Sequence, residues 1–298
     1  MSDIPARDDD AAEAPDWFRW ALAQLPERGR VDVEGAGIEW LTWGERGRPG
    51  LLLAGGNGAH MGWWRWIAPY LADGYRVTAM TWSGMGGSDW RDGYAPEQFV
   101  REAMGVAEAT GLFSAPVAPV MIGHSFGGIL TALAAATVGE RLRGAILIDA
   151  RLHTRSVWGA DAAPVPPRRI HPSREAVIAR FRLQPRQPQR HRYILDLIAG
   201  EALETADGGW RWRADPYIRH KTDLGTNLTG LIPRARCPLM FIRGGLSTTL
   251  TEDIWAEHQR LAPPGTPFVV IPDAHHHVMI DQPIALLSVI AAMVRMLP

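Results

Sequence analysis

Val117-Ala-Pro-Val-Met-Ile122 is an apolar run, and it leads directly into Gly123-His-Ser-Phe-Gly127. The run is typical of a buried strand, and the apolar residues that follow, up to Val138, are typical of a helix. Ser125 then lies on a strand-to-helix turn, and glycines two positions to either side permit a turn that is too sharp for larger side chains. Such a turn exposes the hydroxyl at the end of the strand, where the first amides of the helix would stabilise an anion. The pattern predicts that Ser125 is a nucleophile.

Short apolar runs alternate with longer helical stretches on both sides of this turn. Strands are expected at residues 51–54, 76–81, 117–122, 145–149, 238–243 and 267–271, and helices at 62–72, 96–110, 126–138, 251–261 and 283–296. A hairpin is expected before them, with strands at 31–33 and 38–43 around a turn at 34–37. This alternation predicts an α/β fold, with a mostly parallel sheet and helices on both of its faces.

Residues 151–232 interrupt the alternation. They contain six prolines between Pro164 and Pro188, two helical segments at 174–181 and 192–204, and a net charge of +6. We interpret them as a helical cap, because a structureless loop of this length would be unusual; a long surface excursion is the alternative. The cap would be inserted into a core domain made of residues 17–150 and 233–298. Residues 1–16 are rich in acidic side chains and are expected to form a flexible tail.

Composition excludes several classes of protein. The formal net charge of −1 argues against a nucleic-acid binder, which needs a concentrated basic face. The single cysteine, Cys237, excludes an intrachain disulfide and a multi-cysteine metal site. The most apolar stretch, 283–294, is shorter than the roughly 18 residues of a membrane span, and the acidic N-terminal residues are unlike a signal peptide. We expect a cytoplasmic protein with a small-molecule substrate and no nucleic-acid or membrane partner; a homodimer stays open.

Three further stretches, together with the serine turn, resemble the α/β-hydrolase fold family, in particular its capped members with a serine nucleophile. They are Leu51-Leu-Leu-Ala-Gly-Gly-Asn-Gly-Ala-His60, Ser83-Gly-Met-Gly-Gly-Ser-Asp89 and Ile271-Pro-Asp-Ala-His-His276. The first is similar to the family's oxyanion loop, the second to its G-x-G-x-S-D stretch and the third to its histidine loop. The resemblance implies a sheet of the eight-stranded type. In one departure, Gly55 stands where the family usually has a histidine that holds the oxyanion loop, which leaves the support of that loop open.

A serine hydroxyl becomes a good nucleophile only when a neighbouring base removes its proton. The resemblance of residues 271–272 and 281–283 to the family pattern selects His276 as this base. Three histidines in a row, 275–277, are also typical of a metal-binding tract. The order serine, acid, histidine along the chain favours catalysis, and we predict no metal site.

The acid of such a triad orients the imidazole and stabilises its charged form. The family usually places it after the strand expected at 238–243, but residues 244–250 contain no carboxylate. Some family members place the acid at the end of the preceding strand, which here corresponds to Asp149. An ordinary strand-end aspartate is the alternative interpretation of Asp149. Asp253, expected in the first turn of the helix at 251–261, is the reserve candidate.

The resemblance places the oxyanion hole at the backbone amides of Phe126 and Asn57, with Gly56 beside them. Aromatic residues near these loops and in the cap are candidates for substrate binding, because clustered large aromatics often line apolar pockets. These candidates are Trp63, Trp64, Trp82, His124 and Trp158.

Together these residues predict a cofactor-independent serine hydrolase that cleaves a carboxylic ester or lactone of a small, largely apolar substrate through an acyl-enzyme on Ser125. A carbon–carbon bond hydrolase of ring-cleavage diketones is the second hypothesis, because it would use the same fold, triad and cap. A non-catalytic receptor for a small molecule is the third. Receptors of this kind usually lack a member of the triad, whereas this chain has both the serine and the histidine.

Overall fold

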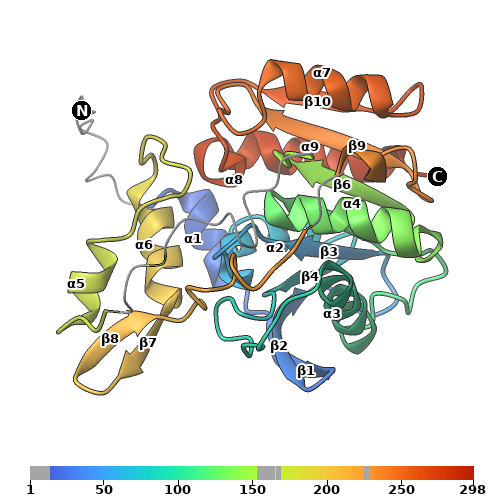
Figure 1. Cartoon of the computed structure of the whole chain (residues 1–298). Helices are drawn as coiled ribbons and strands as arrows, with labels where there is room; N and C mark the ends of the chain where they lie inside the picture. Colours follow the sequence, from blue (N-terminus) through green and yellow to red (C-terminus); the bar gives the residue numbers. More distant parts are fainter. Residues whose placement is uncertain (1–13, 153–164, 166–168, 225–227) are drawn as a thin grey trace.

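An eight-stranded sheet crosses the part of the chain that the computed structural model describes, residues 14–152, 165, 169–224 and 228–298 (Figure 1). In spatial order its strands are β1 (Glu27–Val33), β2 (Ala36–Trp43), β4 (Arg76–Met80), β3 (Gly50–Ala54), β5 (Val120–His124), β6 (Gly144–Ile148), β9 (Leu239–Gly244) and β10 (Phe268–Ile271). Neighbours from β4 to β10 are parallel, whereas β1 and β2 are antiparallel additions at one edge. The arrangement confirms the expected α/β fold.

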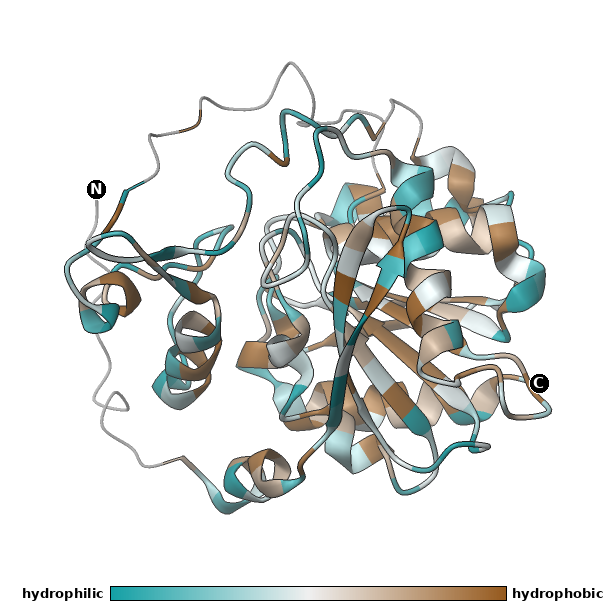
Figure 2. Cartoon of the chain, turned by 90° about the horizontal axis from the view of Figure 1, so that it is seen from below, coloured by the Kyte–Doolittle hydropathy of each residue, from teal (hydrophilic) through white to brown (hydrophobic). Residues whose placement is uncertain are grey.

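Helices cover both faces of this sheet. One apolar core contains residues of α3 (Pro96–Ala109), α4 (Phe126–Val138) and α7 (Glu252–Leu261), and the other contains residues of α1 (Asp16–Ala23), α2 (Ala68–Leu71), α8 (Val278–Asp281) and α9 (Pro283–Met296). Strands β3 to β6 are buried at every residue, as expected of parallel strands that are covered on both sides. Figure 2 shows the hydrophobic colour along these central strands. Among the described residues, no helix is long and apolar enough to cross a membrane.

Some helices and strands begin or end at other residues than expected, because of prolines and turn residues in the chain. Strand β5 begins at Val120 rather than at residue 117, because Pro119 cannot donate to a central ladder. The helix expected at 62–72 is instead two short pieces, η2 (Met61–Trp64) and α2, and Pro69 lies in the first turn of the second piece. The hairpin is confirmed and is longer than expected, with a two-residue turn at Glu34 and Gly35. Both turn residues have positive φ angles, 52° and 78°, as a type I′ turn requires.

The insertion, by which we mean residues 151–232, joins β6 to β9. Its described part contains α5 (Arg174–Ile178), α6 (Arg192–Glu201), and a hairpin of β7 (Leu203–Ala206) and β8 (Gly209–Trp212). The two helices lie at the positions expected for them, whereas the hairpin was not expected. Asp207-Gly208 turns this hairpin, and Asp-Gly is a strong hairpin signal that the sequence offered.

Buried hydrogen bonds attach the insertion to the rest of the molecule. His60 Nε2 donates to the carbonyl of Ile198 in α6 over 2.9 Å, and the Tyr94 hydroxyl donates to Asp215 over 2.9 Å. The loop at 182–191 is attached through Gln187, which accepts from the backbone N–H of His277 over 3.0 Å. This loop therefore lies against the segment that carries His276.

Candidate active site

Ser125 lies between the end of β5 and the start of α4. Its backbone has a φ of 54° and a ψ of −116°, an unfavourable conformation for a residue with a side chain. Close backbone contacts explain the flanking glycines: a Cβ at Gly123 would lie 2.2 Å from the carbonyl oxygen of Gly127, and a Cβ at Gly127 would lie 2.5 Å from that of Gly55. The sequence pattern thus sets a sharp turn that leaves the Ser125 side chain at the edge of the sheet and half-buried.

His276 follows β10 in a loop that returns to this edge of the sheet. Its Nε2 lies 2.9 Å from Ser125 Oγ, and its Nδ1 lies 2.8 Å from Asp149 Oδ1. With the Nδ1 proton donated to the carboxylate, the lone pair of Nε2 accepts the hydroxyl proton of Ser125. His276 is only 3% exposed, so bulk water does not compete for these contacts. The arrangement can pass a proton from the serine to the imidazole.

Asp149 is fully buried at the end of β6, and its φ of 44° turns the chain sharply after the strand. Besides His276, two donors from the loop after β9 hold its carboxylate. The backbone N–H of Gly244 donates to Oδ2 over 2.8 Å, and the Ser247 hydroxyl donates to Oδ1 over 2.6 Å. These hydrogen bonds compensate the burial of the carboxylate.

Asp253, the reserve candidate, is exposed in the first turn of α7, where its carboxylate accepts a hydrogen bond from Thr251. The structure thus brings Asp149, and not Asp253, to His276. Sequence reasoning missed Ser247 altogether. Residues 244–250, where the family usually has its acid, contain no carboxylate but do contain hydroxyl side chains. This pattern could have indicated that a hydroxyl from this loop contacts an acid supplied by another strand.

A cavity of about 360 Å³ opens beside Ser125 and His276. Its other described lining residues are Gly56, Asn57, Ala59, Trp63, His124, Phe126, Ile129, Arg151, Gln184, Pro185, Arg219, Leu224, Leu228, Thr249 and His277. The three candidates for the oxyanion hole, Phe126, Asn57 and Gly56, therefore share the cavity wall with Ser125. A Cβ at Gly56 would lie 3.2 Å from Ser125 Cβ, so this loop passes close to the serine.

The aromatic candidates for substrate binding divide into two groups. Trp63 and His124 line the cavity beside Ser125. Trp64 and Trp82 do not line it, and the expectation for them is corrected: both are fully buried in the apolar cores. Trp158 lies outside the described residues.

Trp82 instead supports the loop at 55–58, which contains the oxyanion-hole candidates Gly56 and Asn57. Its indole N–H donates to the carbonyl of Gly55 over 3.0 Å. Met85 contributes a second contact, because its sulfur lies 3.3 Å from the backbone N–H of Gly58. The loop is thus held by neighbouring side chains although Gly55 replaces the histidine that the family usually has there.

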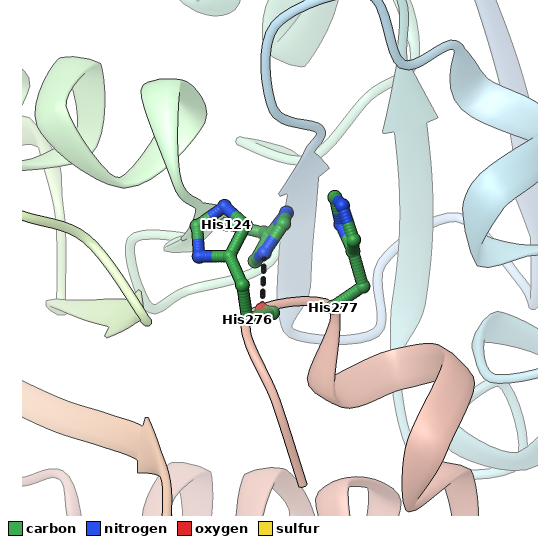
Figure 3. Close-up of side chains that lie close together, drawn as sticks. All are labelled: His124, His276 and His277. Carbon is green, nitrogen blue, oxygen red and sulfur yellow. Dashed lines mark hydrogen bonds between the residues drawn. The ribbon is translucent and has the colours of Figure 1, made fainter. Parts of the chain in front are cut away.

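Two further histidines, His124 and His277, surround His276 (Figure 3). His124 Nε2 donates to the backbone carbonyl of His276 over 2.9 Å, which fixes the position of the histidine loop. Burial lowers the pKa of both His124 and His277 well below the usual 6.5, and the neighbouring His276 lowers both further. Both rings are therefore neutral at pH 7.

Comparison with known proteins supports the same fold. The sequence profile of the alpha/beta hydrolase family matches residues 51–289. Esterase Rv0045c of Mycobacterium tuberculosis is 27% identical over 280 residues, which cover 89% of this chain and 88% of that protein.

Solved structures of other hydrolases have the same fold, at lower sequence identity to this chain. The thioesterase domain from the curacin biosynthetic pathway has a TM-score of 0.76 and 21% identity, with 90% of this chain and 99% of that chain covered. E-2-(acetamidomethylene)succinate hydrolase has a TM-score of 0.76 and 21% identity, with 91% and 99% covered. These structural likenesses establish the fold, and the profile spans most of the sequence. The chain therefore belongs to the alpha/beta hydrolase family.

Proposed function

We propose that this chain is a serine hydrolase of carboxylic esters or lactones, with Ser125 as nucleophile, His276 as general base and acid, and Asp149 as the acid that orients His276. The observation that carries the proposal is the continuous hydrogen-bonded chain from Ser125 Oγ through His276 to Asp149, at 2.9 and 2.8 Å. The esterase from M. tuberculosis, a relative over most of the chain, supports an ester as the scissile group.

The reaction would proceed in two halves. Ser125 Oγ attacks the ester carbonyl carbon while its proton moves to His276 Nε2. The C–O bond to the alcohol then breaks, His276 returns the proton to the leaving oxygen, and the acyl group stays on Ser125. In the second half His276 takes a proton from a water molecule, whose oxygen attacks the acyl carbonyl carbon. The bond from that carbon to Ser125 Oγ then breaks, His276 returns the proton to Oγ, and the carboxylic acid leaves.

The oxyanion that forms in each half needs two backbone donors at the same point. Phe126 is the first residue of α4, so its N–H belongs to the positive end of the helix. Asn57 would provide the second N–H from the loop that Trp82 supports, with Gly56 allowing the close approach. The cavity wall also contains Ile129, Leu224 and Leu228, which favours a small substrate with an apolar acyl or alcohol group.

The test is hydrolysis of p-nitrophenyl esters of increasing acyl length, combined with mass spectrometry after labelling by a fluorophosphonate. We expect turnover, a label on Ser125, and a fall in kcat of several orders of magnitude for Ser125→Ala. Ser288→Ala, on the exposed side of α9, is the matched control and should keep the parent activity.

Two other outcomes of this test would contradict the proposal and favour one of the alternative functions. A label on Ser125 without ester turnover would contradict simple esters as substrates, and ring-cleavage diketones would be tested next by the loss of their yellow colour. Ligand binding with neither label nor turnover would contradict the hydrolase and favour a receptor.

A further inference from the structure

His124, His276 and His277 bring three imidazole rings together (Figure 3), and all three residues line the cavity. The ring centroids lie 4.8 Å apart for His124 and His276, 5.4 Å for His124 and His277, and 4.9 Å for His276 and His277. One nitrogen from each ring lies within 4.8 Å of the other two. All three residues are at least 95% buried, so their separations are set by the packing of the protein.

Each ring has a nitrogen with a lone pair to offer. His124 Nε2 donates to a carbonyl oxygen, which only accepts, so the lone pair of His124 is on Nδ1. Within the described part of the chain, His124 Nδ1 is buried without a hydrogen-bond partner. His277 contacts the backbone of Gln184 through one ring nitrogen, and its other ring nitrogen is buried without a partner. His276 has its lone pair on Nε2, where it accepts from Ser125. Buried polar atoms without partners are rare in proteins, and a bound ion is one explanation for them.

Imidazole is a common metal ligand, and it binds a metal ion through the lone pair of an unprotonated ring nitrogen. The ring nitrogens of these three histidines lie close enough together for one metal ion to contact all three. Imidazole nitrogens favour Zn²⁺, Cu²⁺ and Ni²⁺ over Ca²⁺ and Mg²⁺.

Only two of the three consecutive histidines, His276 and His277, belong to this cluster. His275 Nδ1 instead lies 2.8 Å from Asp281 Oδ2, and its backbone N–H donates to the same oxygen. His124, which comes from β5 and is 152 positions away from His276, completes the set. The strand-to-helix turn that positions Ser125 therefore also contributes the third ligand.

We propose that His124, His276 and His277 form a site for one divalent transition-metal ion, with Zn²⁺ as the representative, and that occupancy of this site inhibits the enzyme. An ion bound to His276 Nε2 would occupy the lone pair that accepts the serine proton. The fourth position of a tetrahedral shell would face the cavity and hold water. Zn–N bonds of about 2.0–2.1 Å place two ligand nitrogens about 3.4 Å apart, so the rings must draw closer when the ion binds.

Binding can be tested independently of catalysis, by isothermal titration of the full-length, chelator-treated protein with ZnCl₂. We expect one ion per chain in the parent and in Ser125→Ala, because the serine hydroxyl is not a ligand. His277→Gln and His124→Gln should each weaken binding at least tenfold. His275→Gln is the matched control, since His275 is adjacent in sequence but bonds Asp281, and it should bind Zn²⁺ as the parent does.

The prediction that the bound ion inhibits catalysis rests on the proposed function, and it is tested separately by measuring ester hydrolysis. Zn²⁺ should inhibit ester hydrolysis with an inhibition constant close to the calorimetric Kd, and EDTA should restore activity. Each variant is compared with its own metal-free rate, and thermal melting verifies that it is folded. If no ester is hydrolysed, calorimetry still decides the metal site, and the proposed function fails separately.

Two results would overturn the proposal. One is equal Zn²⁺ affinity in His277→Gln, His124→Gln and His275→Gln, which would place the ion elsewhere. The other is one tightly bound ion per chain with full esterase activity, which would show that the ion leaves His276 Nε2 free.

Discussion

The ends of β6 and β9 lie side by side at the same edge of the sheet, yet they contribute different chemistry. β6 ends in Asp149, whose carboxylate reaches His276 over 2.8 Å. β9 ends in Gly244 and a loop that contains no carboxylate up to Leu250, and it contributes the Gly244 N–H and the Ser247 hydroxyl as donors to Asp149. In the proposed triad, one strand end thus supplies the acid, and its neighbour holds that acid in place.

This difference shows what the fold fixes and what it leaves free. Because β6 and β9 are adjacent and parallel, both of their carboxyl ends point toward the loop that carries His276. The fold therefore fixes where an acid is useful, but either strand end can supply it. We propose Asp149 as the acid because its carboxylate contacts His276, and the following predictions test that division of roles.

The largest effect is expected for Asp149→Asn. An amide in this position can donate as well as accept, so it no longer holds the imidazole of His276 in the form that takes the serine proton. In a serine protease the equivalent change lowers kcat by about 10⁴-fold, and we expect a loss of about 10³- to 10⁴-fold here. The measurement is kcat on a p-nitrophenyl ester, with thermal melting to verify folding. Retention of more than a tenth of the parent activity would remove Asp149 from the triad.

A second substitution should move the acid to the neighbouring strand end. Ser247 already contacts the oxygen of Asp149 that binds His276, so Asp149→Asn combined with Ser247→Asp places a carboxylate next to the vacated position. We expect at least a tenfold recovery of kcat relative to Asp149→Asn alone. Asp149→Asn combined with Ser288→Asp adds the same charge on exposed α9 and should give no recovery. Equal rates in the two double variants would show that the strand ends are not exchangeable.

A smaller effect is expected for Ser247→Ala, because Ser247 positions the acid without contacting the substrate. A hydrogen bond to a charged group contributes about 1.5 kcal/mol or more, which corresponds to roughly a tenfold change. We expect kcat to fall about tenfold with KM unchanged, and Ser247→Thr, which keeps the hydroxyl, to retain most of the activity. A rise in KM with kcat unchanged would show instead that Ser247 acts on substrate binding.

The last prediction concerns stability at low pH, where no effect on the catalytic rate is needed for the test. Burial lowers the pKa of His60, His124 and His277 in the folded protein below the usual 6.5, so unfolding takes up protons below that pH. The stability they contribute is present in full above pH 6.5 and is lost as the pH falls toward the lowered folded-state pKa values. Each histidine adds up to about 1.4 kcal/mol per pH unit in this window. Urea unfolding between pH 7 and 5 should show this loss, with a smaller slope in His277→Gln; an unchanged slope would contradict the lowered pKa.

Local patterns were sufficient to predict much of the fold and part of the site. Gly123, Ser125 and Gly127 could be identified because the contacts that require the glycines occur within one turn and the loop packed on it. The alternation of apolar runs predicted the parallel sheet for the same reason, since each strand and helix is recognised from its own residues. The β7–β8 hairpin was missed although Asp207-Gly208 marked its turn.

The rest depends on contacts between distant parts of the chain. Trp63 lines the cavity whereas Trp64 is fully buried in the core. The sequence alone does not distinguish these two adjacent tryptophans. Their difference is set by how η2 packs on the sheet. Ser247 acquires its role only when β9 pairs with β6, and the histidine cluster forms only when the loop after β10 meets β5. No local sequence pattern predicts these tertiary contacts.

The most direct test of the account is the rate at which a fluorophosphonate labels Ser125 in the parent, in Asp149→Asn and in Asp253→Asn. This rate reports the activation of the serine hydroxyl and requires no knowledge of the natural substrate. We predict that Asp149→Asn slows labelling by at least 100-fold, whereas Asp253→Asn labels at the parent rate. Normal labelling in Asp149→Asn together with slow labelling in Asp253→Asn would contradict the assignment of the triad.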